Sequence, residues 1–362
     1  MLSTLLRVIP PPAFMTMSCV GLDISDTSLK YIAFKPTLRD QGARELTLWG
    51  DIDIPSGVVN RGEVLDSQKL VAVLKEFKEK TKAEFVRVSL PEERAYMFET
   101  EIKTNTPLKE IRGLLEFRLE ENVPIPSRDV FFDYSIMPFV AGDRALSISV
   151  VAYAKQTIQL YYDACVEAGL RPISFEVEAQ AMARAMVPKD ISGAALIVDF
   201  GKTRTGIGIV YKGTLLYTST VDIGGAQLSQ ILRKTLGDKS EAELTRIKNT
   251  EGLVRGVDSS AVRETLIPTV SVIRDEIATR MQYWHLRSGN QDERRITSII
   301  LCGGSANLKG FPEYMTETLG VPTVRGNVWE NAFSLEDNVP PVDRRHSFGY
   351  AAAVGLALKS IL

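Results

Sequence analysis

Apolar residues alternate with polar ones near the start of the chain in a pattern that predicts three strands. These strands cover residues 19–25, 29–36 and 45–54. Short turn-rich stretches separate them, as is typical of an antiparallel meander. Apolar residues at helical spacing then predict a helix over 66–81, and a further apolar run predicts a strand over 84–90. The apolar face of this helix consists of Leu70, Val73, Leu74 and Phe77.

Residues 92–170 have the pattern of a smaller α/β unit inserted after the first sheet. Strands are predicted over 95–102, 130–139 and 145–154. One helix is expected to begin at Pro107, and another to cover 156–170 with Gly169 near its C-terminal end. The apolar face of the first helix comprises Ile111, Leu114, Leu115 and Leu119.

The meander pattern returns in the second half of the chain. Strands are predicted over 194–201, 206–213 and 215–225. A mostly helical stretch covers 225–288, with a long helical pattern from about 259 to 286, before a strand at 296–304 and a helix near Phe311. Residues 348–362 form an alanine-rich segment that predicts a closing helix, docked in a core groove and too short to span a membrane.

The composition limits the class of protein. Of 362 residues, 44% are hydrophobic and 24% are charged, which is the balance of a globular protein long enough for two domains. A net charge of −2 argues against nucleic acid as a partner. No stretch approaches the roughly 18–20 apolar residues of a membrane span. Three consecutive prolines interrupt residues 1–17, which we expect to be an arm rather than a signal peptide.

The cysteines and histidines are scattered along the chain. Cys19, Cys165, Cys302, His285 and His346 form no cluster, so a structural zinc site is not predicted. The sparse, odd cysteine count fits a reducing cytoplasm. Cys19 and Cys302 lie in apolar runs and are expected to be buried, and both histidines are expected to be structural.

One internal repeat carries the chemistry. Residues 20–34 and 196–210, about half the chain apart, share an apolar strand, an aspartate, a tiny residue, polar residues and a second strand. The aligned pairs are Asp23 with Asp199, Ser25 with Gly201, and Thr27 with Thr203. Either loop alone also fits a plain hairpin turn. Together the two loops predict a pair of facing sites.

The residues of these loops suit a phosphate clamp. Tight turns point backbone N–H groups outward, tiny residues allow close approach, and hydroxyl and basic groups donate further bonds. The candidate phosphate-binding residues are Ser25, Asp26, Thr27, Ser28, Lys30, Gly201, Lys202, Thr203 and Thr205. Asp23 and Asp199 would repel phosphate unless a cation lay between them, and Mg²⁺ fits that place.

A third segment extends the candidate site. Gly303 and Gly304, followed by Ser305, stand between the strand at 296–304 and the next helix. Glycines there let the backbone pass close beneath a flat ligand such as adenine. A tight strand-to-helix turn without a ligand is the alternative. The dinucleotide fingerprint and the P-loop are both absent from the sequence.

The three segments, in this order, resemble the phosphate 1, phosphate 2 and adenosine motifs of the actin, Hsp70 and sugar-kinase superfamily. Within it the chain resembles the PilM family of type IV pilus assembly proteins. That resemblance also rests on DIGGAQLSQIL (222–232), SEAELTRIK (240–248), GLALK (355–359) and EVEAQAMARAM (176–186), together with the stretch 168–172.

The resemblance implies an α/β, actin-like (ribonuclease H-like) two-domain fold with an inserted 1C-type subdomain. It assigns 1–17 to an arm and 18–91 to subdomain 1A, completed by 171–191 and 340–362. The insert is 92–170, subdomain 2A combines 192–224 with 296–339, and subdomain 2B is 225–295.

The resemblance further implies binding of ATP and Mg²⁺. Gly224 and Gly225 would approach the phosphates or ribose, and Glu243 the ribose or adenine. Three positions depart from the usual pattern. Ser25 replaces a glycine, Arg246 stands where the helix usually offers lysine, and Asn327–Val328 replaces an Asn-Pro pair.

By this resemblance the protein is an ATP-binding cytoplasmic scaffold of the inner-membrane platform for type IV pili. It would dock the N-terminal cytoplasmic peptide of a PilN-type membrane protein, in a groove between 1A and 1C, and would meet other platform components. It would reach the inner face of the membrane only through these partners.

Other functions stay open at this stage. For a phosphotransferase or ATPase, Asp199 is the only motif residue that could orient water, and its expected role is to hold magnesium, so slow or absent turnover is predicted. No acidic base marks a sugar kinase. A filament protein similar to FtsA or MreB is disfavoured because the last helix reads as part of the core. The cytoplasmic domain of GspL is disfavoured by the missing membrane span.

Overall fold

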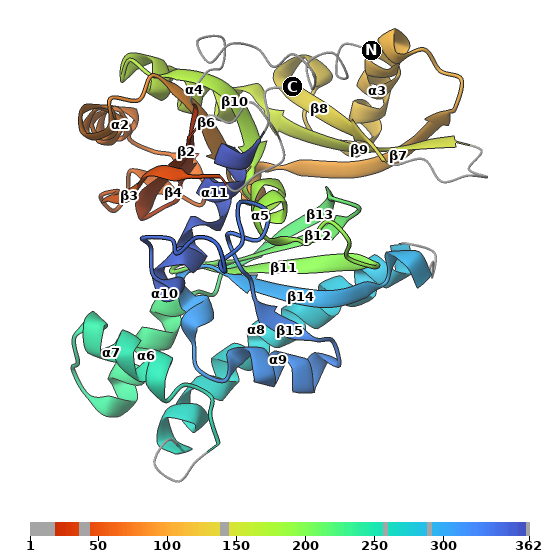
Figure 1. The fold of residues 1–362 in the computed structure, drawn as a ribbon. Helices are drawn as coiled ribbons and strands as arrows, with labels where there is room; N and C mark the ends of the chain where they lie inside the picture. Colours follow the sequence, from red (N-terminus) through yellow and green to blue (C-terminus); the bar gives the residue numbers. More distant parts are fainter. Residues whose placement is uncertain (1–18, 36–43, 138–144, 256–259, 288–291, 360–362) are drawn as a thin grey trace.

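The computed structural model describes residues 19–35, 44–137, 145–255, 260–287 and 292–359 (Figure 1). The first sheet has the strand order β10-β6-β1-β2-β3. Its strands are β1 (Cys19–Ile24), β2 (Ser28–Phe34), β3 (Leu46–Asp53), β6 (Phe85–Leu90) and β10 (Arg171–Val177). The first three form the predicted antiparallel meander, and β6 and β10 run parallel to β1.

The second sheet has the equivalent order, β13-β12-β11-β14-β15. Its strands are β11 (Ala194–Phe200), β12 (Thr205–Tyr211), β13 (Thr214–Val221), β14 (Ile296–Cys302) and β15 (Thr323–Arg325). An antiparallel meander is again extended by two parallel strands. The repeat seen in the sequence is therefore a repeat of sheet topology, and Asp23 and Asp199 occupy matching places on β1 and β11.

Helices pack each sheet into a core. Between the sheets lie α5 (Glu178–Met186) and α11 (Ala351–Leu358), which pack on each other, while α11 also covers β1 (Figure 1). On the other side α2 (Ser67–Thr81) packs against α4 (Lys155–Glu167), beside the hairpin of β4 (Val59–Asn60) and β5 (Glu63–Val64). The predicted face of α2 is buried, as are the three cysteines, which carry no disulfide.

The insert is a three-stranded antiparallel sheet with one helix. Its strands are β7 (Tyr96–Lys103), β8 (Val130–Ile136) and β9 (Ala145–Ala154), and α3 (Leu108–Asn122) covers the sheet. Ile111, Leu115 and Leu119 of α3 are buried, whereas Leu114 is 45% exposed, so its predicted place on the apolar face is wrong. These three buried residues repeat every four positions, and Leu114 flanks that stripe.

Two packing details bear on the predicted subdomain boundaries, which stay predictions. The helix α4 packs mainly on α2 and β10, with a smaller contact to β9 of the insert. The core of the insert runs only from Phe98 to Ala152. We therefore propose that the insert ends near residue 154. It contacts the second sheet through Ser149 Oγ, which donates to Leu215 O at 3.0 Å, and through the Arg294–Glu99 ion pair at 2.8 Å.

Against the second sheet lie α8 (Ser260–Arg287) and α9 (Phe311–Leu319), while α6 (Gly225–Leu236) packs on α8 and α7 (Glu241–Thr250) packs on α6 (Figure 1). The closing helix is shorter than predicted. The segment 344–350 forms a separate helical turn, α10 (Arg344–Ser347), and a 3₁₀ turn, η6 (Phe348–Tyr350), before α11 begins. Residues 1–17 and the end of the predicted helix, 360–362, lie outside the described residues. No helix in the described ranges is both long and apolar enough to cross a bilayer.

Candidate functional site

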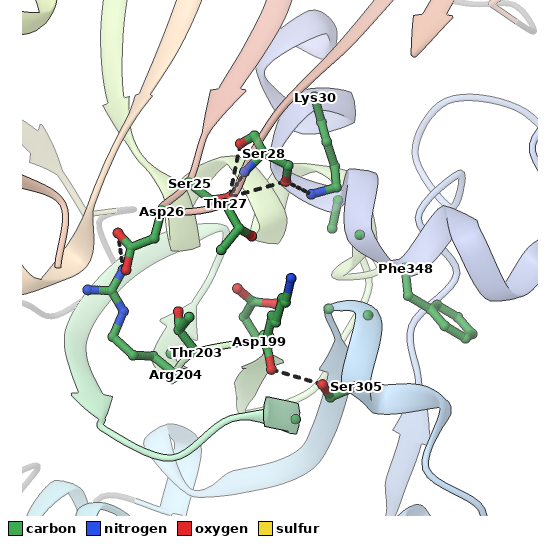
Figure 2. A pocket seen from close by; sticks show the side chains of 18 of the residues that line it. Ser25, Asp26, Thr27, Ser28, Lys30, Asp199, Thr203, Arg204, Ser305 and Phe348 are labelled. Carbon is green, nitrogen blue, oxygen red and sulfur yellow. Dashed lines mark hydrogen bonds and ion pairs between the residues drawn. The ribbon is translucent and has the colours of Figure 1, made fainter. Parts of the chain in front are cut away.

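A cavity of about 770 Å³ lies between the two halves of the molecule, a size typical of ligand pockets. Both aspartate loops line it, together with the start of α6, one face of α7 and the turn after β14. Figure 2 shows Thr27, Thr203 and Asp199 facing its open centre. The structure thus brings together segments that are far apart in the sequence, as the repeat predicted.

The first loop is a tight turn closed by its own serines. The Ser25 N–H donates to Ser28 O at 2.9 Å, and Ser25 Oγ donates to the same carbonyl. Lys30 stands opposite Asp23 in the β1–β2 register, and its Nζ donates to Ser28 Oγ at 2.6 Å (Figure 2). An ammonium group is therefore fixed at the wall of the cavity, beside an aspartate.

The second loop is closed in the same way and is tied to α6. The Gly201 N–H donates to Arg204 O at 2.9 Å. The carbonyls of Gly201 and Lys202 accept from Gly225 N–H and Ala226 N–H at 3.0 and 2.9 Å. Because these contacts use the N–H groups at the start of α6, the helix holds the loop rather than offering those donors to a ligand.

Other N–H groups of the loops stay available. Within the described ranges, the amides of Asp26, Thr27, Lys202 and Thr203 have no acceptor in the protein. All four residues line the cavity. Two unpaired N–H groups on each facing loop make a concavity suited to an anion.

Two predicted binding residues near the second loop do not line the cavity. Thr205 is fully buried, and its Oγ1 donates to Ile223 O at 2.6 Å. Gly224 comes directly before α6 and lies against the second loop, where a Cβ on it would be 2.5 Å from Lys202 O. Both residues support the loop, and we propose that they position it. Their predicted contact with the ligand stays a prediction.

Asp23 and Asp199 both line the cavity. Asp23 is buried, and its Oδ1 accepts from Ser89 Oγ at 2.8 Å. Burial and the charge of Asp23 raise the pKa of Asp199 to about 6, and Lys30 offsets this in part. Two carboxylates that repel each other across a phosphate site fit a bound cation.

The surrounding donor set also bears on magnesium. In the described part of the chain, no group of three or more His, Cys, Asp or Glu side chains is arranged to hold a metal ion by itself. Magnesium usually binds through one or two carboxylates together with phosphates and water. Asp23 and Asp199 fit that mode, in which the nucleotide completes the coordination.

The glycine turn after β14 behaves differently at its two glycines. Gly303 has a φ of +82°, and a Cβ there would lie 2.3 Å from Asp199 Oδ1. A Cβ on Gly304 would meet nothing within 4 Å, although Gly304 lines the cavity. Ser305 also lines it and donates through Oγ to Gly201 O at 2.9 Å. Gly303 is thus needed for the turn, and Gly304 leaves open space.

The face that α7 turns to the cavity is not the predicted one. Glu243 is exposed and accepts from Ser240 N–H at 2.9 Å as part of a capping box, and Arg246 is exposed as well. The residues of α7 that line the cavity are Glu241, Thr245, Lys248 and Asn249. We therefore propose this neighbouring face for the ligand, and the assignment of Glu243 and Arg246 to the ligand stays a prediction. Asn327–Val328 does not line the cavity either.

Lys248 is the buried cation of this wall. Its Nζ donates to Ser229 Oγ at 2.6 Å and to Gly225 O at 3.1 Å, and it lies 3.6 Å from Glu241 Oε1. Burial lowers the pKa of Lys248, against the charge of Glu241. Glu241, Thr245 and Lys248 are spaced four and then three residues apart, which places all three on one helix face. That spacing was the signal in the sequence that could have identified them.

Two buried acids were missed by the sequence reasoning. Glu92, in the 3₁₀ turn η2 (Glu92–Arg94) after β6, and Glu178, at the start of α5, both line the cavity and are hydrogen-bonded to each other. Burial raises the pKa of Glu92 to about 8 and that of Glu178 well above its ordinary range. Since β6 and β10 are parallel to β1, the residues after them meet Asp23 at one sheet edge, and that topology was the available signal.

The histidines differ from each other. His285 lies near the end of α8, away from the cavity, where its Nε2 accepts from Ile296 N–H at 3.5 Å. His346 lines the cavity from α10 and pairs with Asp343, although its side chain is 81% exposed. It is a residue of the rim.

Comparison with known proteins identifies the lineage of this architecture. The sequence profile of the family described as "Type IV pilus assembly protein PilM" matches residues 21–361. A chain of a PilM-PilN type IV pilus biogenesis complex has 20% identity and a TM-score of 0.74, over 94% of this chain and 98% of that one. The ethanolamine utilization protein EutJ from Carboxydothermus hydrogenoformans has 17% identity and a TM-score of 0.55, over 96% and 90%.

MreB5 of Spiroplasma citri bound to ADP is also similar, with 13% identity and a TM-score of 0.52, over 88% of this chain and 94% of that one. At such identities these likenesses establish the fold. The predicted α/β, actin-like fold is confirmed.

Proposed function

The chain belongs to the PilM family of type IV pilus assembly proteins, and we propose that it is an ATP-binding scaffold of the pilus assembly platform. In this role it sits at the cytoplasmic face of the inner membrane and docks the N-terminal peptide of a PilN-type membrane protein. The similar PilM-PilN complex supports a partner of that type. The bound nucleotide would hold the two halves of the molecule in one arrangement.

The facing loops carry the nucleotide part of this proposal. The unpaired N–H groups of Asp26, Thr27, Lys202 and Thr203, with the ammonium of Lys30, suit the phosphates of ATP. Lys248, Glu241 and Gly304 line the rest of the cavity and would surround the ribose and base.

Asp23 and Asp199 would hold Mg²⁺, which supplies positive charge against the phosphate oxygens when bound. The two carboxylates of the protein fix where that charge lies. In the free protein, burial first and the charge of Asp23 second raise the pKa of Asp199, and a bound cation would offset both effects.

We propose slow or absent ATP turnover. Besides Asp199, the cavity is lined by Glu92 and Glu178, two further carboxyls that could receive a proton from water. The pKa of Glu92 is raised to about 8, however, so its carboxyl is mostly neutral at pH 7, and burial raises the pKa of Glu178 as well. A neutral carboxyl is a poor base. The nucleotide is therefore a structural ligand rather than a substrate consumed in each cycle.

The test is calorimetric titration of the purified protein with MgATP and, separately, with a PilN-type N-terminal peptide. Saturable binding of both is expected, with little phosphate released over the same period. Failure of MgATP to bind would overturn the nucleotide assignment. Failure of the peptide to bind, with and without MgATP, would overturn the partner. Rapid phosphate release by the protein alone would overturn the scaffold role.

A further inference from the structure

One side chain of the second aspartate loop reaches across the cavity. Arg204 Nη2 lies 2.9 Å from Asp26 Oδ1 (Figure 2). Its Nη1 lies 2.7 Å from Glu93 Oε1. Arg204 belongs to the β11–β12 loop of the second half, whereas Asp26 and Glu93 belong to the first half. The three side chains are only 15%, 11% and 18% exposed. This cluster, which we call the Arg204 latch, joins the halves at the phosphate side of the cavity.

Asp26 is anchored on its own side as well. Its carboxylate accepts from Arg61 N–H and Gly62 N–H, both at 3.3 Å, in the turn between β4 and β5. A second ion pair, Arg61 with Asp222 at 2.5 Å, also crosses between the halves, but both side chains are about 60% exposed. Exposed pairs contribute little, so the buried latch is the stronger link.

The charges around the latch explain why it matters. The walls of the cavity carry the acids Asp23, Asp26, Glu92, Glu93, Glu178 and Asp199. If Arg204 were neutral, the carboxylates of Asp26 and Glu93, both on the first half, would lose the guanidinium of the second half that lies between them. The two carboxylates would then repel each other, and no ion pair of this cluster would join the halves.

The latch is also incompletely satisfied. Glu93 Oε2 and Arg204 Nη1 are buried atoms without a hydrogen bond of good geometry. Buried polar atoms in that condition weaken an interaction, so the contacts can exchange for others. A cluster of this kind closes the cleft and still allows it to open.

We propose that the Arg204 latch holds the cleft closed through protein contacts alone, and that it slows the access and release of nucleotide. Closure by the latch does not depend on the proposed function. The effect on nucleotide exchange rests on it.

The test measures the distance between the halves with two labels. The native cysteines are buried, so cysteines introduced as Glu79→Cys on α2 and Lys234→Cys on α6, both exposed positions, can be labelled selectively. Arg204→Gln is compared with Lys202→Gln, which removes the same charge from the same loop at a residue with no ion pair in the described structure. Circular dichroism and the melting curve show whether each variant folds.

Without nucleotide, R204Q should shift the distance distribution to longer and broader values, while K202Q and the parent protein share one narrow distribution. MgATP should return R204Q toward the parent and leave the parent unchanged. Release of a fluorescent ATP analogue should be about tenfold faster from R204Q, since such changes act mainly on dissociation. The double variant D26N/E93Q should behave like R204Q.

Identical distributions for R204Q and the parent would overturn the latch, as would equal opening in K202Q, which would indicate a general charge effect. If R204Q does not fold, the charge-swapped pair R204E/E93R replaces it and should keep the narrow distribution. If MgATP does not bind at all, the proposed function fails, but the distances without nucleotide still decide the latch.

Discussion

At the scale of one residue, Asp199 is where the proposed cation site can be tested. Its carboxylate is held beside that of Asp23, and its pKa is raised to about 6 by burial first and by Asp23 second. We expect Asp199→Asn to weaken MgATP binding at least about tenfold, about 1.4 kcal/mol, because one of the two proposed magnesium ligands would be lost. Calorimetry with and without EDTA measures this.

EDTA should weaken ATP binding to the parent protein by a similar factor and have little further effect on D199N. In the absence of ligand, D199N should melt at the same temperature or higher, since asparagine has nearly the same shape as aspartate but lacks the charge that repels Asp23. Undiminished MgATP affinity in D199N would contradict the metal assignment.

Glu92 makes a prediction about pH. Its pKa rises from an ordinary 4.5 to about 8 on folding, so the folded state binds a proton that the unfolded state releases above pH 4.5. This contribution to stability is complete below about pH 4.5 and is lost as pH rises through about 8. Glu92→Gln removes it and keeps an oxygen that can accept from Glu178. The Tm of the variant minus the Tm of the parent should therefore be at least about 2 °C larger at pH 8.5 than at pH 5.

Thermal melts across that pH range measure the difference. Glu79→Gln, an exposed change of the same chemistry, is the matched control and should melt in parallel with the parent protein at every pH. A constant Tm difference between E92Q and the parent would show that Glu92 does not change its protonation on folding.

At the scale of elements, the turn from β14 into η5 (Gly304–Asn307) separates stability from binding. Gly303→Ala should lower the Tm, because φ is +82° and the new Cβ would meet Asp199 Oδ1. Gly304→Val adds a side chain in open space at the cavity wall. We expect G304V to fold like the parent and to bind ATP at least about tenfold more weakly.

Melting curves and ATP titrations of both variants check this pair. The expected result is a destabilised G303A and a stable G304V with weak binding. A G304V protein that binds ATP normally would place the nucleotide away from this turn.

Elements were more predictable than their contacts. The two meanders, the face of α2 and the start of α3 follow from local periodicity, which the chain expresses over a few residues. The face of α7 that lines the cavity was not predicted. The motif pointed to Glu243, whose side chain forms the capping box at the start of α7, whereas Glu241 and Lys248 line the cavity. The resemblance supplied the motif, but only the packing of α7 shows which face meets the cavity.

The site divides in the same way. The aspartate loops were found because each is a local pattern and the two repeat. Glu92, Glu178 and the partners of Arg204 were not found, since Asp26 and Glu93 meet Arg204 only after both halves have folded. Tertiary contacts of that range leave no signal in sequence spacing.

On the scale of the whole molecule, the two halves share one strand order and face each other across one cavity. A ligand that contacts both halves shifts the protein toward the arrangement of the halves that it binds more tightly, by the difference between its affinities for the two arrangements. The insert lies against the first half and also touches β13 and Arg294 of the second half. A partner bound near the insert would therefore sense the same arrangement as the nucleotide.

This connection predicts linkage between nucleotide and partner. If a PilN-type peptide prefers the arrangement that MgATP favours, MgATP should tighten peptide binding by about fivefold or more, and the peptide should tighten MgATP binding by the same factor. Calorimetric titrations in both orders measure the two factors. D199N is the matched control, because in that variant the peptide should bind as it does to the nucleotide-free parent, whether or not MgATP is added. Equal peptide affinity with and without MgATP in the parent would mean that the cleft and the partner site are independent, and that ATP does not set the arrangement on which the platform is built.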